Sequence, residues 1–296
     1  MPSIARTWAV ARYELTCDLR KKRTYIVVGL FLFAAFVFGY LWPVIWGKSV
    51  TSAQLQIGVS FGSGLWWVAA VFLAFNTPAS GIFPILVGGF ISADSLASEF
   101  DSGTVVPLLS QPVRRVEVYL GKFLAKLLIL LLVSILFTLL VIAGSEVSVG
   151  AQTHLDMFPL LVFAEFGAFL EFAALTFFIG SFSRSGAMVL GILIAVSSMI
   201  GIPVLVAELQ FGFQEPMLLL PVVNAFFLLG HVIPWYIVQP SGVMVVQGYV
   251  FGAGPTLPAL VSVVSALQYA LAGLVVTVAV PLVAGYYRFR IAEVKT

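Results

Sequence analysis

Six long apolar stretches run through the sequence, and they limit the fold more than any other feature. A helix rises about 1.5 Å per residue, so about 20 apolar residues cross the ~30 Å hydrocarbon core of a bilayer. Lipid offers the backbone no hydrogen-bond partners, so each stretch is expected to be helical. The sequence therefore predicts an all-α, polytopic membrane protein with six transmembrane helices, at about residues 25–46, 66–91, 123–144, 158–182, 187–207 and 261–286.

The composition excludes the main soluble classes of protein. Hydrophobic residues make up 61% of the chain and charged residues only 9%, whereas about 25% of a soluble domain is charged. A soluble globular domain, a disordered chain and a basic nucleic-acid binder all disagree with these values, so no nucleic-acid partner is expected. The single cysteine, Cys17, excludes an internal disulfide framework.

The basic residues predict which side of the membrane each loop faces. In the six-span arrangement, only Lys48 of the 15 Lys and Arg residues falls on the second side. Basic residues gather in cytoplasmic loops, so we expect a multi-pass protein of the cytoplasmic membrane with both termini cytoplasmic. No cleavable signal peptide is expected, because a polar, charged segment precedes the first span. The residues on the basic side are Arg6, Arg12, Arg20, Lys21, Lys22, Arg23, Arg114, Arg115, Lys122, Lys126, Arg184, Arg288, Arg290 and Lys295.

A seventh apolar segment, residues 217–238, is interrupted by Pro221, Asn224, His231 and Pro234. If it spanned the membrane, the basic C-terminal residues would lie outside, against the charge rule. We therefore predict an outer loop over residues 208–258, folded as short re-entrant or interfacial helices shielded by the bundle. The alternative is a true seventh span with an external C-terminus.

Residues 1–24 form a separate region before the single transmembrane domain of residues 25–296. Its apolar residues recur at steps of three and four, which places them on one face of a helix. We predict an interfacial amphipathic helix whose apolar face enters the lipid headgroup boundary, while residues 20–23 meet anionic membrane lipid. A solvated leader with chance periodicity is the alternative. The face consists of Ile4, Trp8, Ala11, Leu15 and Leu19.

The sequence contains no energy source of its own. It has no phosphate-binding loop, because Gly121-Lys122 is followed by Phe123 and lacks the upstream glycine. His154 and His231 are far apart, and no nucleophile stands beside a base, so neither a metal site nor a catalytic site is expected. Any nucleotide chemistry must therefore come from a partner, and no cofactor is expected in this chain.

The most polar part of the chain is a loop of residues 92–122, between the second and third spans. It is predicted to hold a short helix through Leu96 and Glu99 that stops at Gly103, where glycine tolerates a positive φ. A second short helix over residues 105–109 is expected to end before Pro112. Residues 113–126 then carry the chain back into the membrane.

This loop resembles that of the type-2 ABC exporter permeases, the membrane subunits of the ABC-2 family. The family pattern is an acidic residue, Gly-Thr, a Leu-Leu pair, Pro, an Arg and then Gly-Lys at the start of the third helix. The predicted topology, with an interfacial first helix and a long last outer loop, is also similar to that family. The matching residues are Glu99, Gly103, Thr104, Leu108, Leu109, Pro112, Arg114 or Arg115, Gly121 and Lys122.

The resemblance implies that residues 99–110 are a coupling helix seated in a cleft of an ATP-binding subunit. Two such subunits would carry the ATP and magnesium, and a second permease chain would complete a homo- or heterodimer. The implied activity is export of an amphipathic or hydrophobic cargo by alternating access. Family members usually carry basic residues around the acidic one, whereas this chain has Asp101 and Ser102 there. We therefore expect a complementary basic groove on the ATPase.

Two further interpretations remain open beside transport. In the first interpretation, the chain is a regulatory or structural membrane component that binds an ATPase without moving cargo. In the other it is an intramembrane enzyme that uses Glu165 or Glu171, although it lacks a metal motif and a paired base. Some similar permeases belong to copper-site maturation systems, and this membership also stays open.

Four polar residues within the predicted spans need a reason to be there, because charged and polar groups are expensive in lipid. Asn76 and Thr77 precede Pro78 in the second span, and Glu165 and Glu171 lie in the fourth. Six residues correspond to about 120° around a helix, so the two carboxylates do not share one face. These residues line a transport path, or they form hydrogen bonds between helices.

Overall fold

The computed structural model describes residues 3–41, 44–45, 82–102, 113–148, 155, 158–183, 185–211, 219, 243–246, 249–250, 254–255 and 259–291. Several features predicted from the sequence lie outside the described residues. They are Asn76 and Thr77, the coupling residues Gly103, Thr104, Leu108, Leu109 and Pro112, and, apart from Leu219, the seventh apolar segment 217–238.

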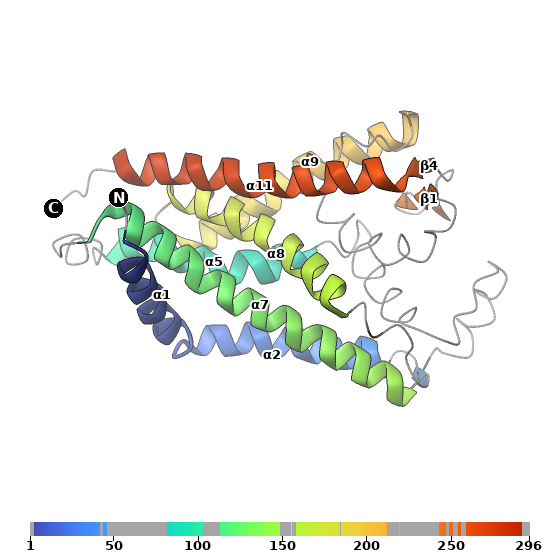
Figure 1. Cartoon of the computed structure of the whole chain (residues 1–296), viewed down its shortest axis with the longest axis horizontal. Helices are drawn as coiled ribbons and strands as arrows, with labels where there is room; N and C mark the ends of the chain where they lie inside the picture. Colours follow the sequence, from blue (N-terminus) through green and yellow to red (C-terminus); the bar gives the residue numbers. More distant parts are fainter. Residues whose placement is uncertain are drawn as a thin grey trace.

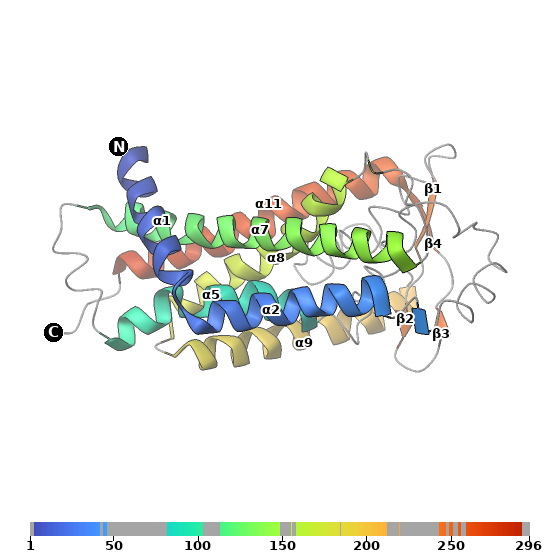
Figure 2. The same cartoon turned by 90° about the horizontal axis from the view of Figure 1, so that it is seen from below.

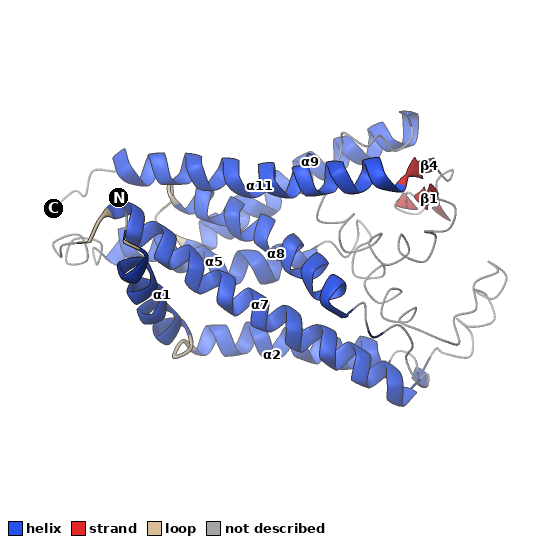
Figure 3. Cartoon of the chain, viewed as in Figure 1, coloured by secondary structure: helices blue, strands red, loops and turns tan. Residues whose placement is uncertain are grey.

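Helices make up most of the described chain, and most of them run along its long axis (Figures 1, 2 and 3). The short helix α1 crosses the others at one end, which we call the α1 end. The helices are α1 (Ile4–Asp18), α2 (Lys22–Phe36) with its π-helical continuation η1 (Val37–Leu41), α5 (Ile82–Ser102), α7 (Arg115–Ser148), α8 (Phe158–Gly180), α9 (Gly186–Phe211) and α11 (Val263–Ile291).

Four helices in the described part of the chain are long and apolar enough to cross a membrane. Shorter apolar stretches lie in α5, at Ile85–Ala97, and in α9, at Gly186–Ser197. These helices support a multi-pass membrane protein, while the count of six spans stays a prediction. The four long candidates are Lys22–Leu41, Arg115–Ser148, Val162–Gly180 and Gln268–Ile291.

The segment that follows the second predicted span differs from the sequence prediction. Instead of a separate short helix through Leu96, α5 continues without a break from Ile82 to Ser102. Residues 92–102 contain no glycine or proline, and the side chains of Ala93, Leu96 and Ala97 stay buried at steps of three and four. The described helix runs to Ser102, and Gly103, where the sequence predicts its stop, lies outside the described residues.

Helix α8 lies at the centre of the bundle and contacts α5, α7, α9 and α11. Aromatic side chains fill the space between it and the neighbouring helices. Phe31 of α2 stacks on Phe137 of α7 with 4.3 Å between ring centroids, and meets Phe169 of α8 edge-on at 5.5 Å. Such pairs stabilise helix contacts beyond simple burial of apolar area.

The end of the molecule opposite α1 carries two short antiparallel strand pairs (Figure 1). Strand β1 (Val243–Val246) pairs with β4 (Ala259–Ser262), and β2 (Tyr249–Val250) pairs with β3 (Gly254–Pro255). The sequence predicts short helices in the outer loop 208–258, so this prediction is wrong at residues 243–246, 249–250 and 254–255. The run Val-Met-Val-Val is rich in β-branched residues, which favour strands.

Candidate functional site

The segment predicted to couple to an ATPase is flanked by two helix ends that lie at the α1 end. Helix α5 finishes at Ser102, and α7 begins at Arg115 (Figures 1 and 2). The described residues around these two ends carry most of the charged side chains that are buried in the structure. The contacts of these side chains define the candidate site.

Helix α1 crosses directly over the start of α7 because Gly121 permits a close approach. A Cβ atom placed on Gly121 would lie 2.7 Å from the Cβ of Val10 and 2.9 Å from the carbonyl oxygen of Thr7. Ala11, on the same side of α1, is fully buried. Any larger residue at position 121 would therefore push α1 away from α7.

Two buried ion pairs fix α1 to α7 in one register. Lys122 pairs with Glu14, and Lys126 pairs with Asp18. No side chain in these pairs is more than 9% exposed. Because residues four apart lie on one face of a helix, the two acids of α1 meet the two bases of α7 as consecutive rungs.

Glu117 joins the first residues of α1 and α7. Its carboxylate accepts a hydrogen bond of 2.7 Å from the backbone N–H of Ser3, the N-cap of α1. It also accepts one of 2.9 Å from the backbone N–H of Arg114, just before α7. A carboxylate at a helix N-terminus satisfies unpaired amides and complements the helix dipole. The sequence gives no role to Glu117, although its position three residues after Arg114 is typical of a capping box.

Arg115 connects the start of α7 to the end of α11. Its guanidinium donates a hydrogen bond of 2.7 Å to the carbonyl oxygen of Arg290, in the last turn of α11. A cation at a helix C-terminus satisfies a free carbonyl and complements the dipole. Arg114, by contrast, is exposed. Of the two arginines matched to the family pattern, Arg115 contacts this chain itself and Arg114 faces outward.

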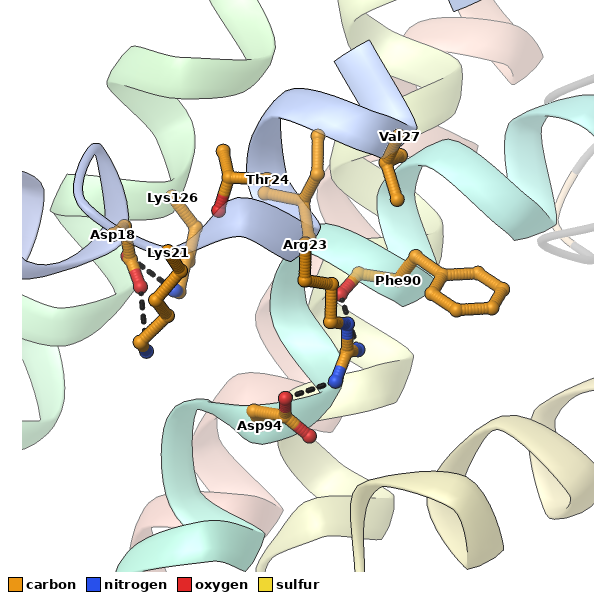
Figure 4. Close-up of a pocket in the computed structure, with 9 residues that line it drawn as sticks. Asp18, Lys21, Arg23, Thr24, Val27, Phe90, Asp94 and Lys126 are labelled. Atoms are coloured by element: carbon orange, nitrogen blue, oxygen red, sulfur yellow. Dashed lines mark hydrogen bonds and ion pairs between the residues drawn. The ribbon is translucent and has the colours of Figure 1, made fainter. Parts of the chain in front are cut away.

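Arg23, at the start of α2, reaches across to α5 (Figure 4). Its guanidinium pairs with the Asp94 carboxylate and donates a hydrogen bond of 2.9 Å to the carbonyl oxygen of Phe90. It also lies 5.3 Å from the centroid of the Phe90 ring, within range of a cation–π contact. The planar fork of arginine therefore makes three contacts with one short stretch of α5.

Asp94 also lies against the first residue of α9. A Cβ atom placed on Gly186 would overlap the Asp94 carboxylate, so any larger residue at this position would require that carboxylate to move. The carboxylate thus sits beside the N-terminus of α9, where negative charge is favourable. Asp94 brings together the beginnings of α2 and α9 on the surface of α5.

The Asp18–Lys126 and Arg23–Asp94 ion pairs line one small cavity (Figure 4). Its volume of about 20 Å³ holds about one water molecule and no cargo. Burial raises the pKa of Asp18, but the ammonium groups of Lys126 and Lys21 outweigh it and hold the pKa below its ordinary value. Lys21 lies 2.9 Å from Asp18. The cavity is lined by Asp18, Lys21, Arg23, Thr24, Val27, Phe90, Ile91, Asp94 and Lys126.

A family model described as ABC-2 family transporter protein matches residues 8–294, which is nearly the whole chain. The chain belongs to the ABC-2 family. This result confirms the resemblance inferred from the loop, and it makes the chain an ABC-2 type permease. A comparison with curated proteins finds no relative that matches it.

ABC-2 permeases are membrane transport components rather than a catalytic family, and they generally work with an ABC ATP-binding subunit. Within the described residues, no group of three or more His, Cys, Asp or Glu side chains is arranged to hold a metal ion.

The predicted apolar face of α1 is partly exposed and partly buried in this ABC-2 protein. Ile4 and Trp8 are 88% and 51% exposed, whereas Ala11 is buried against α7. Leu15 is half-buried, and Leu19, just past the helix end, is 42% exposed. The exposed residues are those available to lipid. Glu14 and Asp18, three and seven residues after Ala11, lie on the same buried side of the helix, in ion pairs that the sequence pattern alone misses.

Two sequence signals point to those ion pairs in retrospect. Lys122 and Lys126 are four residues apart near an otherwise apolar span, and Glu14 and Asp18 repeat that spacing in the amphipathic segment. Charges that lie close to lipid usually have a partner. The sequence does not say, however, which acid meets which base.

The intramembrane acids of α8 lie inside the bundle. Glu165 is 1% exposed, and its carboxylate accepts a hydrogen bond of 3.1 Å from the hydroxyl of Thr138 on α7. Glu171 is fully buried. The Glu165 contact is a hydrogen bond between α7 and α8, and the role of these acids in a transport path stays a prediction. Glu99, the acidic residue of the family pattern, lies in the last turns of α5.

Proposed function

We propose that this ABC-2 protein is the permease subunit of an ATP-driven exporter in the cytoplasmic membrane. It moves an amphipathic or hydrophobic cargo by alternating access, and two ATP-binding subunits supply ATP and magnesium. A second permease chain completes the transport unit. The family match over residues 8–294 carries the proposal, and the absence of a phosphate-binding loop from the sequence supports an ATPase in a separate chain.

The α1 end is the cytoplasmic end in this proposal. Basic residues mark the cytoplasmic side of membrane proteins, and the described basic side chains gather around α1, the start of α7 and the end of α11. The 103–112 segment joins α5 to α7 at the same end. The proposed ATPase contact is therefore on the side where ATP is available.

The residues of the family pattern divide into two groups by their contacts. Glu99, Gly103, Thr104, Leu108, Leu109, Pro112 and Arg114 are the proposed contacts with the ATP-binding subunit. Gly121 and Lys122 have a different role, because both are buried beneath α1. They hold α1 on α7, just as Arg115 holds α11 at the same end.

The mechanism follows from these connections. Closure of the ATPase around ATP displaces the 103–112 segment, which pulls on the end of α5 and the start of α7. Because α7 is joined to α1 by buried ion pairs and to α11 by Arg115, the displacement reaches several helices together. A shift of these helices alternates access to the cargo site between the two sides of the membrane.

Replacement of Gly103 by Val tests the proposal. The variant should insert and bind the ATP-binding subunit, yet lose the stimulation of ATP hydrolysis that the wild-type chain gives, because Val disfavours a positive φ at a helix stop. Gly191→Val is the matched control, since a Cβ atom at Gly191 meets nothing within 4 Å. Unchanged stimulation by Gly103→Val would contradict the proposed role of the segment.

A further inference from the structure

The turn between α1 and α2 contacts both helices that flank the 103–112 segment. We call residues 18–23 the α1–α2 corner. From this corner, Asp18 pairs with Lys126 on α7 and Arg23 pairs with Asp94 on α5. Lys21, between them in the sequence, also pairs with Asp18. We call the Asp18–Lys126 pair the α7 bridge and the Arg23–Asp94 pair the α5 bridge. The side chains of both bridges line the same small cavity (Figure 4).

The two bridges are at similar distances from the 103–112 segment. Asp94 precedes the end of α5 by eight residues, which is about 12 Å along a helix. Lys126 follows the start of α7 by 11 residues, or about 16 Å. The corner therefore joins α5 and α7 at one level, two to three turns from the segment.

Direct packing does little to hold α5 and α7 together. Helix α5 packs mainly on α8 and α9, and α7 packs mainly on α1, on α2 with η1, and on α8. The polar corner is thus a second connection between the two flanking helices, beside the apolar core around α8.

Buried ion pairs are a poor means of adding stability, because desolvation offsets most of the attraction between the charges. They are better suited to fixing one register between elements, since any other register leaves a charge buried without its partner. Both side chains of the Asp18–Lys126 pair are only 3% exposed, so a different register would leave these charges buried without their partners. For the α5 bridge, the fork of Arg23 fixes the geometry by its contacts with Asp94 and Phe90.

We propose that Asp18 and Arg23 are positioning residues for coupling, and that the α1–α2 corner clasps α5 and α7 so that displacement of the 103–112 segment moves them as one unit. This inference rests on the proposed function, because the displacement is the one that ATP binding causes. With either bridge removed, α5 and α7 move separately, and the displacement of the 103–112 segment no longer moves both helices together. Loss of the second bridge then has no further effect on coupling.

The test removes each bridge alone and both together. Arg23→Gln removes the α5 bridge. Asp18→Asn with Lys126→Met removes the α7 bridge as a pair, which avoids leaving a charge buried without its partner. Arg12→Gln is the matched control, since it makes the same chemical change at an exposed position of α1 outside the α1–α2 corner. Each variant is purified with its ATP-binding subunit in nanodiscs of phosphatidylethanolamine and phosphatidylglycerol, and stimulation of ATP hydrolysis is measured together with the thermal unfolding midpoint.

We expect each bridge variant to lower the stimulation by about fivefold, equivalent to about 1 kcal/mol. The combined variant should lower it no further, because the two bridges act as one unit. Arg12→Gln should match the wild type. Stimulation that falls by the product of the two separate factors, or that is unchanged in bridge variants that still bind the ATP-binding subunit, would overturn the clasp.

A second readout needs no ATPase. In the purified permease alone, amide hydrogen exchange near the end of α5, at residues 99–102, should rise as much in the α7-bridge variant as in Arg23→Gln. The substitutions in the α7-bridge variant lie on α1 and α7, so an effect confined to those helices would overturn the clasp. If no ATP-binding subunit co-purifies with the wild type, the proposed function fails, and this exchange result still decides the clasp.

Discussion

The Glu14–Lys122 pair offers the sharpest prediction about how α1 is held. Lys122 is 1% exposed and Glu14 is 9% exposed, so the pair is shielded from water on both sides. Glu14→Gln deprives the Lys122 ammonium of this partner. Breaking a buried ion pair from one side reduces stability by about 3–5 kcal/mol. We expect this loss to appear as a greater population of molecules in which α1 has separated from α7.

Labelling of a buried thiol measures that population. Ala11 is fully buried where α1 meets α7, so Ala11→Cys, in a chain whose natural Cys17 is replaced by Ser, reacts with a charged maleimide only when α1 separates. A loss of about 3 kcal/mol corresponds to a rate increase of about 100-fold, because labelling follows the open population when closing is fast. The assay is run in nanodiscs, with Arg12→Gln on the exposed side of α1 as the control.

The double variant separates the role of the pair from a general weakening. Replacing both partners, by Glu14→Gln and Lys122→Met, removes the two charges together, and such replacements are often nearly neutral. We expect its labelling rate to lie within about tenfold of the wild-type rate. A Glu14→Gln rate equal to that of Arg12→Gln, or a double variant that labels as fast as the single one, would refute the reasoning.

Two other predictions concern the same contact surface. The pKa of Asp18 lies below its ordinary value of 3.8. The contribution of Asp18 to stability is therefore complete above about pH 4 and is lost as the pH falls through the lowered pKa. The thermal unfolding midpoint, measured from pH 7 to pH 3, should fall at the acid end in the wild type and fall less in Asp18→Asn with Lys126→Met. Gly121→Val should separate α1 from α7 without unfolding the bundle, because the valine side chain would overlap Val10 and the Thr7 carbonyl. Maleimide labelling in the Ala11→Cys background checks this prediction. A labelling rate unchanged by Gly121→Val would show that α1 accommodates the larger side chain.

Hydropathy predicts much of the helical part of the fold. Helices α7, α8 and α11 cover the stretches that length and apolar content single out, because a bilayer-spanning helix needs about 20 apolar residues in a row. The continuation of α5 through residues 92–102 is not predicted. The polar residues there are neutral in helix propensity, and burial of Ala93, Leu96 and Ala97 against neighbouring helices decides the outcome.

The candidate site is predicted in part. The family pattern includes Lys122, but it does not indicate the partner of Lys122, which is Glu14 of α1. A pattern of residue types identifies a charged residue but not its partner, since pairing depends on how two helices cross. The strands near residues 243–262 are not predicted, because periodicity is weak over four residues.

The most direct test of the central claim is the rate at which the ATP-binding subunit hydrolyses ATP with and without this chain. The subunit is purified alone and as a complex with the permease in nanodiscs of one lipid composition. The account predicts that a stable complex forms and that its hydrolysis rate per ATP-binding subunit exceeds that of the free subunit. A subunit that fails to bind the permease, or that hydrolyses ATP at the same rate in both states, would contradict the account.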